Sequence, residues 1–159
     1  GLLRQAGAAL RLRKENNTSI CCMKQGKHIE NCCTVRNEYE VEAPTIEEGL
    51  QHLPEAGAPR ALCEAIACSE LVTLAHTDFH RTAMLLHHIT ADGGCTAELA
   101  LDIGTLGNDT ASVPFSEAEL EFKAGNDDAF LALAAMLETE FSLRPQPLSK
   151  LARAVNAGK

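Results

Sequence analysis

Alternating polar and apolar residues predict extended strands along much of the chain. Between Thr34 and Glu42, Val35, Tyr39 and Val41 fall on one face, and Arg36 and three glutamates fall on the other. Turn residues such as Glu15-Asn16-Asn17 and Asp92-Gly93-Gly94 separate the strands. Strands are predicted at Ala9–Arg13, Ser19–Lys24, Thr34–Glu42, Leu71–Thr77, His80–His88, Ala97–Ile103 and Phe115–Lys123.

Helical patterns interrupt these strands at a few places. Pro44 ends a strand, and Thr45-x-x-Glu48 has the spacing of a capping box that opens a helix with Ile46, Leu50 and Leu53 on one side. A second helix is predicted from Ala58 to Cys68, a third after a cap at residues 126–128, and a short one near the carboxyl end. The pattern predicts an α+β fold in a single domain, residues 1–159, with the helices covering an antiparallel sheet.

Composition narrows the class of protein. The chain has 159 residues, the size of one ordinary domain, and 14 basic against 22 acidic residues give a net charge of -8. This charge argues against nucleic acid and anionic membranes as partners unless the basic residues gather locally. No stretch approaches the roughly 20 apolar residues of a membrane span, and the first residues lack the order of a secretory signal. With 7 cysteines, an odd number, we expect a cytoplasmic protein with free thiols.

The charged faces of the strands admit two interpretations. Each strand could bury its apolar face and show its charges to water, as half-exposed antiparallel strands usually do. Alternatively, the sheet could curl into a barrel whose lumen collects the charges. Such a lumen must hold water, metal and a charged ligand, because buried unpaired charge is costly. Arginine and lysine suit a ligand with several negative oxygens, and carboxylates suit Mg²⁺ or Mn²⁺.

Several motifs resemble those of one family. They include Glu98-Leu99-Ala100-Leu101-Asp102-Ile103-Gly104, the Ser116–Gly125 run, and Leu148-Ser149-Lys150-Leu151-Ala152-Arg153. Earlier pieces are Ala6–Arg13, Cys22-Met23-Lys24 and Arg36-Asn37-Glu38-Tyr39-Glu40. In order and approximate spacing they resemble the CYTH superfamily, the triphosphate tunnel metalloenzymes, which include inorganic triphosphatases, thiamine triphosphatases and class IV adenylate cyclases.

The resemblance implies a fold, an activity and a set of site residues. The fold would be an antiparallel β-barrel, or tunnel, with helices packed on the outside. The activity would be Mg²⁺- or Mn²⁺-dependent hydrolysis of inorganic triphosphate or a small organic triphosphate, and the triphosphatase branch looks closer than the cyclase branch. Glu119 and Glu121 would hold metal, and Glu38, Glu40 and Asp102 would support the metal or orient water. The phosphate chain would be bound by Arg11, Arg13, Lys24, Arg36, Arg81, Lys123 and Lys150.

The sequence departs from the family at its start. The Glu-x-Glu-x-Lys strand of the family has no counterpart, because the chain begins at Gly1-Leu2-Leu3-Arg4, where the family's second segment is already underway. We therefore expect a domain truncated at its amino end, with the first strand of the barrel missing. The exposed sheet edge then predicts a homodimer that covers the gap.

Other functions stay open at this point. A domain that binds polyphosphate or organic phosphates without hydrolysing them, or an inactive remnant, would use the same basic side chains, and cyclase chemistry is a further alternative. Cys21-Cys22 and Cys32-Cys33 resemble halves of a zinc knuckle but lack the usual spacing. His76 and His80 lie four apart in a segment that resembles a strand and a turn, which favours a surface or tunnel-rim position over a metal site.

Overall fold

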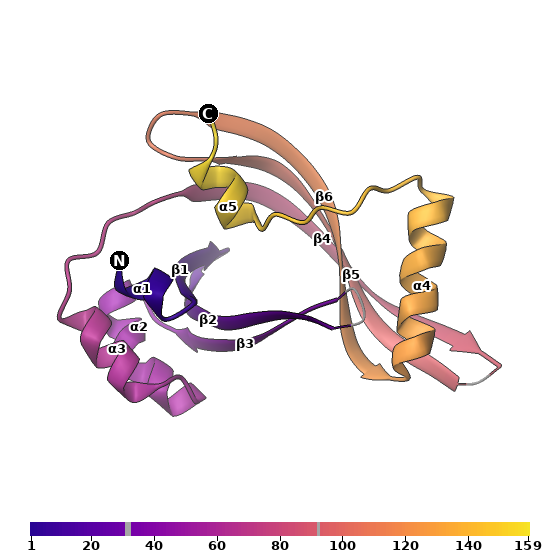
Figure 1. Cartoon of the computed structure of the whole chain (residues 1–159), viewed down its shortest axis with the longest axis horizontal. Helices are drawn as coiled ribbons and strands as arrows, with labels where there is room; N and C mark the ends of the chain where they lie inside the picture. Colours follow the sequence, from indigo (N-terminus) through magenta and orange to yellow (C-terminus); the bar gives the residue numbers. More distant parts are fainter. Residues whose placement is uncertain (31–32, 92) are drawn as a thin grey trace. The chain divides into compact units, whose positions relative to one another are not determined.

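The chain forms two compact units, each built on a three-stranded antiparallel sheet with helices (Figure 1). The computed structural model describes residues 1–30, 33–91 and 93–159. The first unit comprises Gly1–Val72 and the second Thr73–Lys159. The predicted α+β class and the antiparallel sheets are confirmed, whereas the closed barrel and the single domain stay predictions. In the described part of the chain, no helix has the length and apolarity that a membrane crossing requires.

The first sheet has the strand order β1-β2-β3. Its three strands confirm the predicted strands at Ala9–Arg13, Ser19–Lys24 and Thr34–Glu42: the first two are several residues longer than predicted, and the third is one residue longer. A short helix at the start of the chain was not predicted. The elements of this unit are α1 (Leu2–Gln5), β1 (Ala8–Glu15), β2 (Thr18–Glu30), β3 (Cys33–Glu42), α2 (Ile46–His52), the 3-10 helix η1 (Leu53–Ala56) and α3 (Arg60–Ala67).

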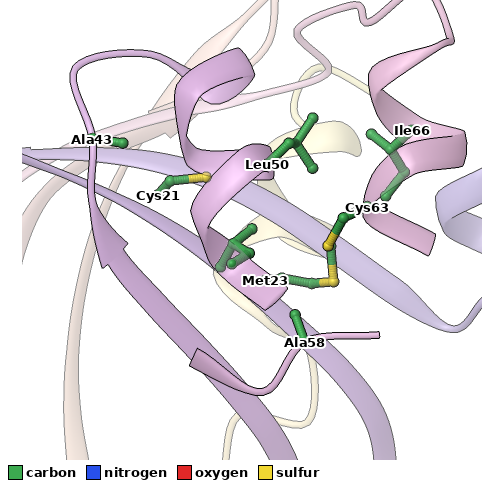
Figure 2. Close-up of a cluster of buried hydrophobic side chains, with 8 residues drawn as sticks. Cys21, Met23, Ala43, Leu50, Ala58, Cys63 and Ile66 are labelled. Carbon is green, nitrogen blue, oxygen red and sulfur yellow. The ribbon is translucent and has the colours of Figure 1, made fainter. Parts of the chain in front are cut away.

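A hydrophobic core joins one face of this sheet to α2, η1 and α3 (Figure 2). Cys21 and Met23 of β2 are fully buried and pack against Leu50 of α2 and against Cys63 and Ile66 of α3. The predicted capping box starts α2 as expected, since the Thr45 side chain accepts a hydrogen bond from the Glu48 backbone N–H at 3.2 Å. The helices therefore cover the apolar face of the sheet, which leaves its charged face on the other side.

The close packing of α2 on β2 predicts a destabilising substitution. A Cβ added at Gly49 would overlap the Cys21 side chain. Alanine raises intrinsic helix propensity by about 1 kcal/mol, but overpacking a core costs about 1–3 kcal/mol. Because the added Cβ would overlap both the Cβ and the Sγ of Cys21, the overpacking cost falls near the upper end of that range, and we expect Gly49→Ala to lower the free energy of unfolding by about 2 kcal/mol in urea titrations. Gln51→Ala, an exposed site on the same helix, is the control, and equal stability of Gly49→Ala and wild type would contradict this packing.

The second sheet has the strand order β4-β5-β6. The predicted strand Leu71–Thr77 is wrong for residues 71–75, which have no regular structure, and its last two residues belong to the same strand as His80–His88. Of the turn predicted at residues 92–94, Asp92 lies outside the described residues, whereas Gly93 and Gly94 belong to β5 and pair with Thr90 and Ile89 of β4. The elements of this unit are β4 (His76–Thr90), β5 (Gly93–Gly107), β6 (Ser112–Gly125), α4 (Asp127–Glu140) and α5 (Lys150–Val155).

Two helices pack on opposite faces of the second sheet (Figure 1). On one face, the ring of Phe130 in α4 meets the ring of Phe122 in β6 edge-on, with centroids 5.4 Å apart. The predicted cap of α4 is Asn126, whose side chain accepts from the Ala129 N–H at 2.9 Å. On the other face, Ala154 of α5 packs with Leu106 and Phe115.

The placement of α5 corrects one expectation about β5. The two-residue alternation of β5 predicts an apolar face of Leu99, Leu101 and Ile103 that is covered, but Ile103 is 67% exposed and Leu101 is 40% exposed. Ala100 and Asp102, on the opposite face, are buried instead. Because α5 covers that face, its charges are shielded by a helix of the same unit.

Candidate functional site

The first sheet carries a row of ion pairs on the face opposite its core. Arg11 of β1 lies opposite Cys22 of β2, which in turn lies opposite Glu40 of β3. Two residues further along β2, Lys24 lies opposite Glu38 of β3. The Lys24 Nζ donates to Glu38 Oε1 at 2.8 Å, and Arg36 Nε donates to the same oxygen at 2.7 Å.

Glu40 sits between two arginines with looser contacts. Its carboxylate oxygens lie 3.9 Å from an Arg11 nitrogen and 3.7 Å from an Arg13 nitrogen. The Nε atoms of both arginines are buried without a hydrogen-bond partner among the described residues, although Arg13 Nε lies 3.5 Å from Glu15 Oε2 in an ion pair. A buried, unpartnered guanidinium nitrogen is an unused donor. This end of the sheet is therefore equipped to take further acceptor oxygens.

Protonation states follow from these neighbours. Burial raises the pKa of Glu38, but hydrogen bonds from Lys24 and Arg36 outweigh it and hold this pKa below its usual value. Glu38 is thus ionised at neutral pH. Burial raises the pKa of the Cys22 thiol, more than Lys24 and Arg11 lower it. Cys22, Glu38 and Glu40 present ligand atoms within 4.8 Å of one another.

The second sheet carries a tighter cluster around a buried carboxylate. Asp102, on β5, is 0% exposed. Register places it opposite Arg81 of β4, whose Nε and NH2 donate to its two carboxylate oxygens at 2.7 Å each. A planar guanidinium fits a carboxylate in this two-pronged way. The Lys150 Nζ, from α5, lies 2.9 Å from Asp102 Oδ2.

Two glutamates of β6 complete this cluster. Glu119 accepts from Arg81 NH2 at 2.5 Å and from Lys150 Nζ at 2.9 Å. Glu117 pairs with Lys150 and with Arg153, the two basic residues of α5. Asp102, Glu117 and Glu119, called the acidic group from here on, offer oxygens within 4.8 Å of one another. Lys150 is the side chain that touches all three.

Aromatic rings support the cations of α5. The Lys150 Nζ lies 5.4 Å from the ring centroid of Phe79 and 5.7 Å from that of Phe115. The Arg153 guanidinium carbon lies 5.4 Å from the Phe115 centroid. Ring faces attract cations at such distances, so α5 is held on this face by both ionic and aromatic contacts.

The contacts shift the pKa values of the cluster away from neutrality. Burial raises the pKa of Asp102, but hydrogen bonds from Arg81 and Lys150 overcome it and leave the pKa lowered. Burial also raises the pKa of Glu119, but the hydrogen bond and charge of Lys150, followed by those of Arg81, leave this pKa lowered as well. Burial lowers the pKa of Lys150, and its hydrogen bonds to Glu117 and Glu119 more than reverse this. Asp102, Glu119 and Lys150 are therefore charged at neutral pH.

The remaining predicted site residues lie elsewhere on the second sheet. Lys123 Nζ is 2.8 Å from Glu121 and 3.6 Å from Glu98, so Glu121 pairs with lysine outside the acidic group. His76 and His80 are both exposed on β4.

The alternative metal sites gain no support from the described residues. The zinc knuckle considered for the cysteines includes Cys32, which lies outside the described residues. The second unit also has a hollow of about 400 Å³, which is lined by His87, His88 and Cys95. Cys95 precedes Asp102 by seven residues on β5, so the hollow lies roughly 23 Å from that carboxylate. Within that hollow His87 Nδ1 is 3.0 Å from Thr96 Oγ1.

The chain matches the CYTH domain family over residues 1–155. This match covers nearly the whole sequence, and the chain belongs to that family. The resemblance expected from the charged strands and the late Ser149-Lys150 segment is thereby confirmed.

Sequence reasoning missed three residues of these clusters. The sequence predicts no role for Glu117, Arg153 or Cys22, although each lies within a motif that resembles the family. A signal was present for Arg153, because it follows Lys150 by three residues and so shares its helix face. Glu117 alternates with Glu119 in the same way, two residues apart on one strand face.

Proposed function

We propose that this CYTH domain binds a triphosphate compound through its strand and helix cations and hydrolyses the terminal phosphate with the help of a divalent cation. The observation that carries the proposal is the cluster on the second sheet, where three carboxylates and three cations meet at hydrogen-bond distance on one face. A metal-bound phosphate chain is a ligand that uses both signs of charge at once.

The acidic group fits a hard divalent cation by its chemistry. Its ligand atoms are carboxylate oxygens, which Mg²⁺ and Mn²⁺ prefer, and they converge within 4.8 Å. In the described structure Lys150 already sits among these oxygens, so a cation there must compete with the ammonium group. We propose Asp102, Glu117 and Glu119 as the metal-holding residues, with Glu121 kept as the weaker candidate beside Lys123. A bound divalent cation would neutralise phosphate charge and lower the pKa of a water molecule.

The cations of both sheets have a defined task in this scheme. Lys150 and Arg81, once shared between carboxylates and phosphate, would neutralise the negative charge that grows on the phosphate oxygens during transfer. On the first sheet, Arg11 would offer its unpartnered Nε donor to phosphate oxygens, and Arg13 would add its guanidinium charge beside Glu15. Lys24 and Arg36 would add further charge, and Lys123 would contribute at the end of the second sheet.

The carboxylates of the first sheet would orient water. Glu38 has a lowered pKa and is therefore a poor proton acceptor at neutral pH, which suits holding a water molecule in place better than deprotonating it. Glu40 would share this task. We further propose that the charged face of each sheet binds phosphate oxygens, in a homodimeric cytoplasmic protein.

Phosphate release tests the catalytic proposal. The protein is incubated with tripolyphosphate, ATP and thiamine triphosphate, with and without Mg²⁺ or Mn²⁺. We expect phosphate to be released only when a divalent cation is present. Binding heat in calorimetry without any release of phosphate would contradict hydrolysis and assign a phosphate-binding domain instead. Cyclic nucleotide formed from ATP would assign the cyclase alternative.

A further inference from the structure

The turn between β5 and β6 contains a side chain with contacts in two directions. Asn108 follows the last residue of β5 and is partly buried. Its Oδ1 accepts from the Thr110 N–H at 2.9 Å, the Thr110 hydroxyl at 2.6 Å and the Ala111 N–H at 3.1 Å. Its backbone N–H also donates to the Ala111 carbonyl at 2.9 Å. The oxygen of this amide thus organises the turn.

The nitrogen of the same amide reaches the end of α5. Asn108 Nδ2 donates to the carbonyl oxygens of Ala154, Val155 and Ala157 at 3.0, 3.2 and 3.1 Å. The last carbonyls of a helix lack partners within the helix, so a side-chain donor there fixes the helix end. The amide oxygen therefore faces donors of the turn, and the amide nitrogen faces acceptors of α5. Only one orientation of the amide group satisfies both sets of hydrogen bonds.

Close packing at the same end leaves α5 little freedom. Ala154 is fully buried in the cluster with Leu106 and Phe115. A Cβ added to Gly158 would lie 2.8 Å from the Ala111 Cβ, so the chain after α5 runs directly against the turn. Lys150 lies four residues before Ala154, about 6 Å along the helix axis. The position of the helix end therefore determines where the Lys150 and Arg153 side chains meet the acidic group.

We propose that Asn108 is the positioning residue of this site: it docks α5 so that Lys150 and Arg153 reach the acidic group and, in the proposed function, the phosphate chain. Asn108 touches none of these charges itself. Its part in phosphate binding rests on the proposed function, whereas its control of the α5 cations does not.

Asn108→Asp removes the donor of the side-chain amide and keeps its acceptor. Aspartate keeps an acceptor oxygen for Thr110 and Ala111, but it cannot donate to the α5 carbonyls and places negative charge beside them. Asn108→Ser is a second variant, since a hydroxyl can serve the turn but is too short for α5. Asn156→Asp is the matched control, because it adds the same charge at the end of α5 without touching the Asn108 contacts.

The first readout needs no ligand. The ring-proton resonances of Phe79 and Phe115 report the cations above them, and Lys150→Gln gives the reference shift. We expect Asn108→Asp to move these resonances in the same direction as Lys150→Gln, and Asn156→Asp to leave them in place. Unmoved rings in both folded Asn108 variants would overturn the proposal, whatever the protein binds.

The second readout connects positioning to affinity. We expect Asn108→Asp to weaken tripolyphosphate binding about 5–10-fold in the wild-type background and to have little effect in a Lys150→Gln background, because coupled residues are not additive. An equal loss in both backgrounds would show that Asn108 acts by another route and would overturn the proposal. If wild type binds no tripolyphosphate, the proposed function fails, while shifted rings still support the positioning role.

Discussion

Replacing Lys150 by Gln is expected to change the two affinities of the site in opposite directions. The Lys150 side chain is 15% exposed, and its ammonium group touches all three carboxylates of the acidic group. Removing it takes a charged donor from the phosphate chain, worth about 1.5–3 kcal/mol, so tripolyphosphate affinity should fall roughly 10–100-fold. It also removes the competitor of a divalent cation, so Mn²⁺ affinity measured without phosphate should rise roughly 3–10-fold.

The two affinities are measured separately. Calorimetry gives the tripolyphosphate constant, and the resonance of free aqueous Mn²⁺ gives the metal constant. Lys159→Gln removes the same charge just beyond α5, where Lys159 contacts only Asn156 among the described hydrogen bonds, and should leave both constants unchanged. Weaker Mn²⁺ binding in Lys150→Gln would show that the lysine supports the cation instead of competing with it.

Asp102→Asn is expected to destabilise the second unit by about 3 kcal/mol, at the lower end of the cost of breaking a buried ion pair. Asp102 is fully buried, and its loss of charge leaves the Arg81 guanidinium and the Lys150 ammonium without their shared partner. Both cations are partly exposed, which keeps the loss at that lower end. Urea titration at neutral pH measures it. Asp78→Asn, an exposed site on β4, is the control and should change stability little.

The same carboxylate sets a pH dependence. Since the pKa of Asp102 is lowered in the folded protein, its contribution to stability is fully present above the pKa of about 4 in the unfolded chain. It is lost as the pH falls through the lower folded pKa. Wild type should therefore lose more stability between pH 5 and acidic pH than Asp102→Asn does. Parallel stability curves for the two proteins would contradict a charge-based role for Asp102.

The strand faces of this fold could be predicted because a two-residue period is a local property of the sequence. The period puts Arg36, Glu38 and Glu40 on one face of their strand, and the structure brings Arg11 and Lys24 of the neighbouring strands to the same face. The same period could not predict which face of β5 is buried. Ile103 alternates as a core residue should, yet α5 packs on the opposite face, and no local pattern shows where a distant helix docks.

The sequence could not predict which carboxylates form the acidic group, because that also depends on where α5 packs. Glu117, Glu119 and Glu121 share one face of β6, so the period alone makes them equal candidates. Strand register and α5 separate them: Lys150 reaches Glu117 and Glu119, whereas Glu121 is left to Lys123. The strand predicted at Leu71–Thr77 failed because an apolar run resembles a strand even where no neighbouring strand pairs with it.

The central claim is that the charged cluster on the second sheet binds a phosphate chain, and amide resonances measure this directly. Tripolyphosphate is titrated into the labelled protein in the presence of Mg²⁺. We expect the amides near Arg81, Glu119 and Lys150 to shift together with one dissociation constant, and this constant to rise in Lys150→Gln. Saturating tripolyphosphate that leaves these amides unmoved would contradict the claim.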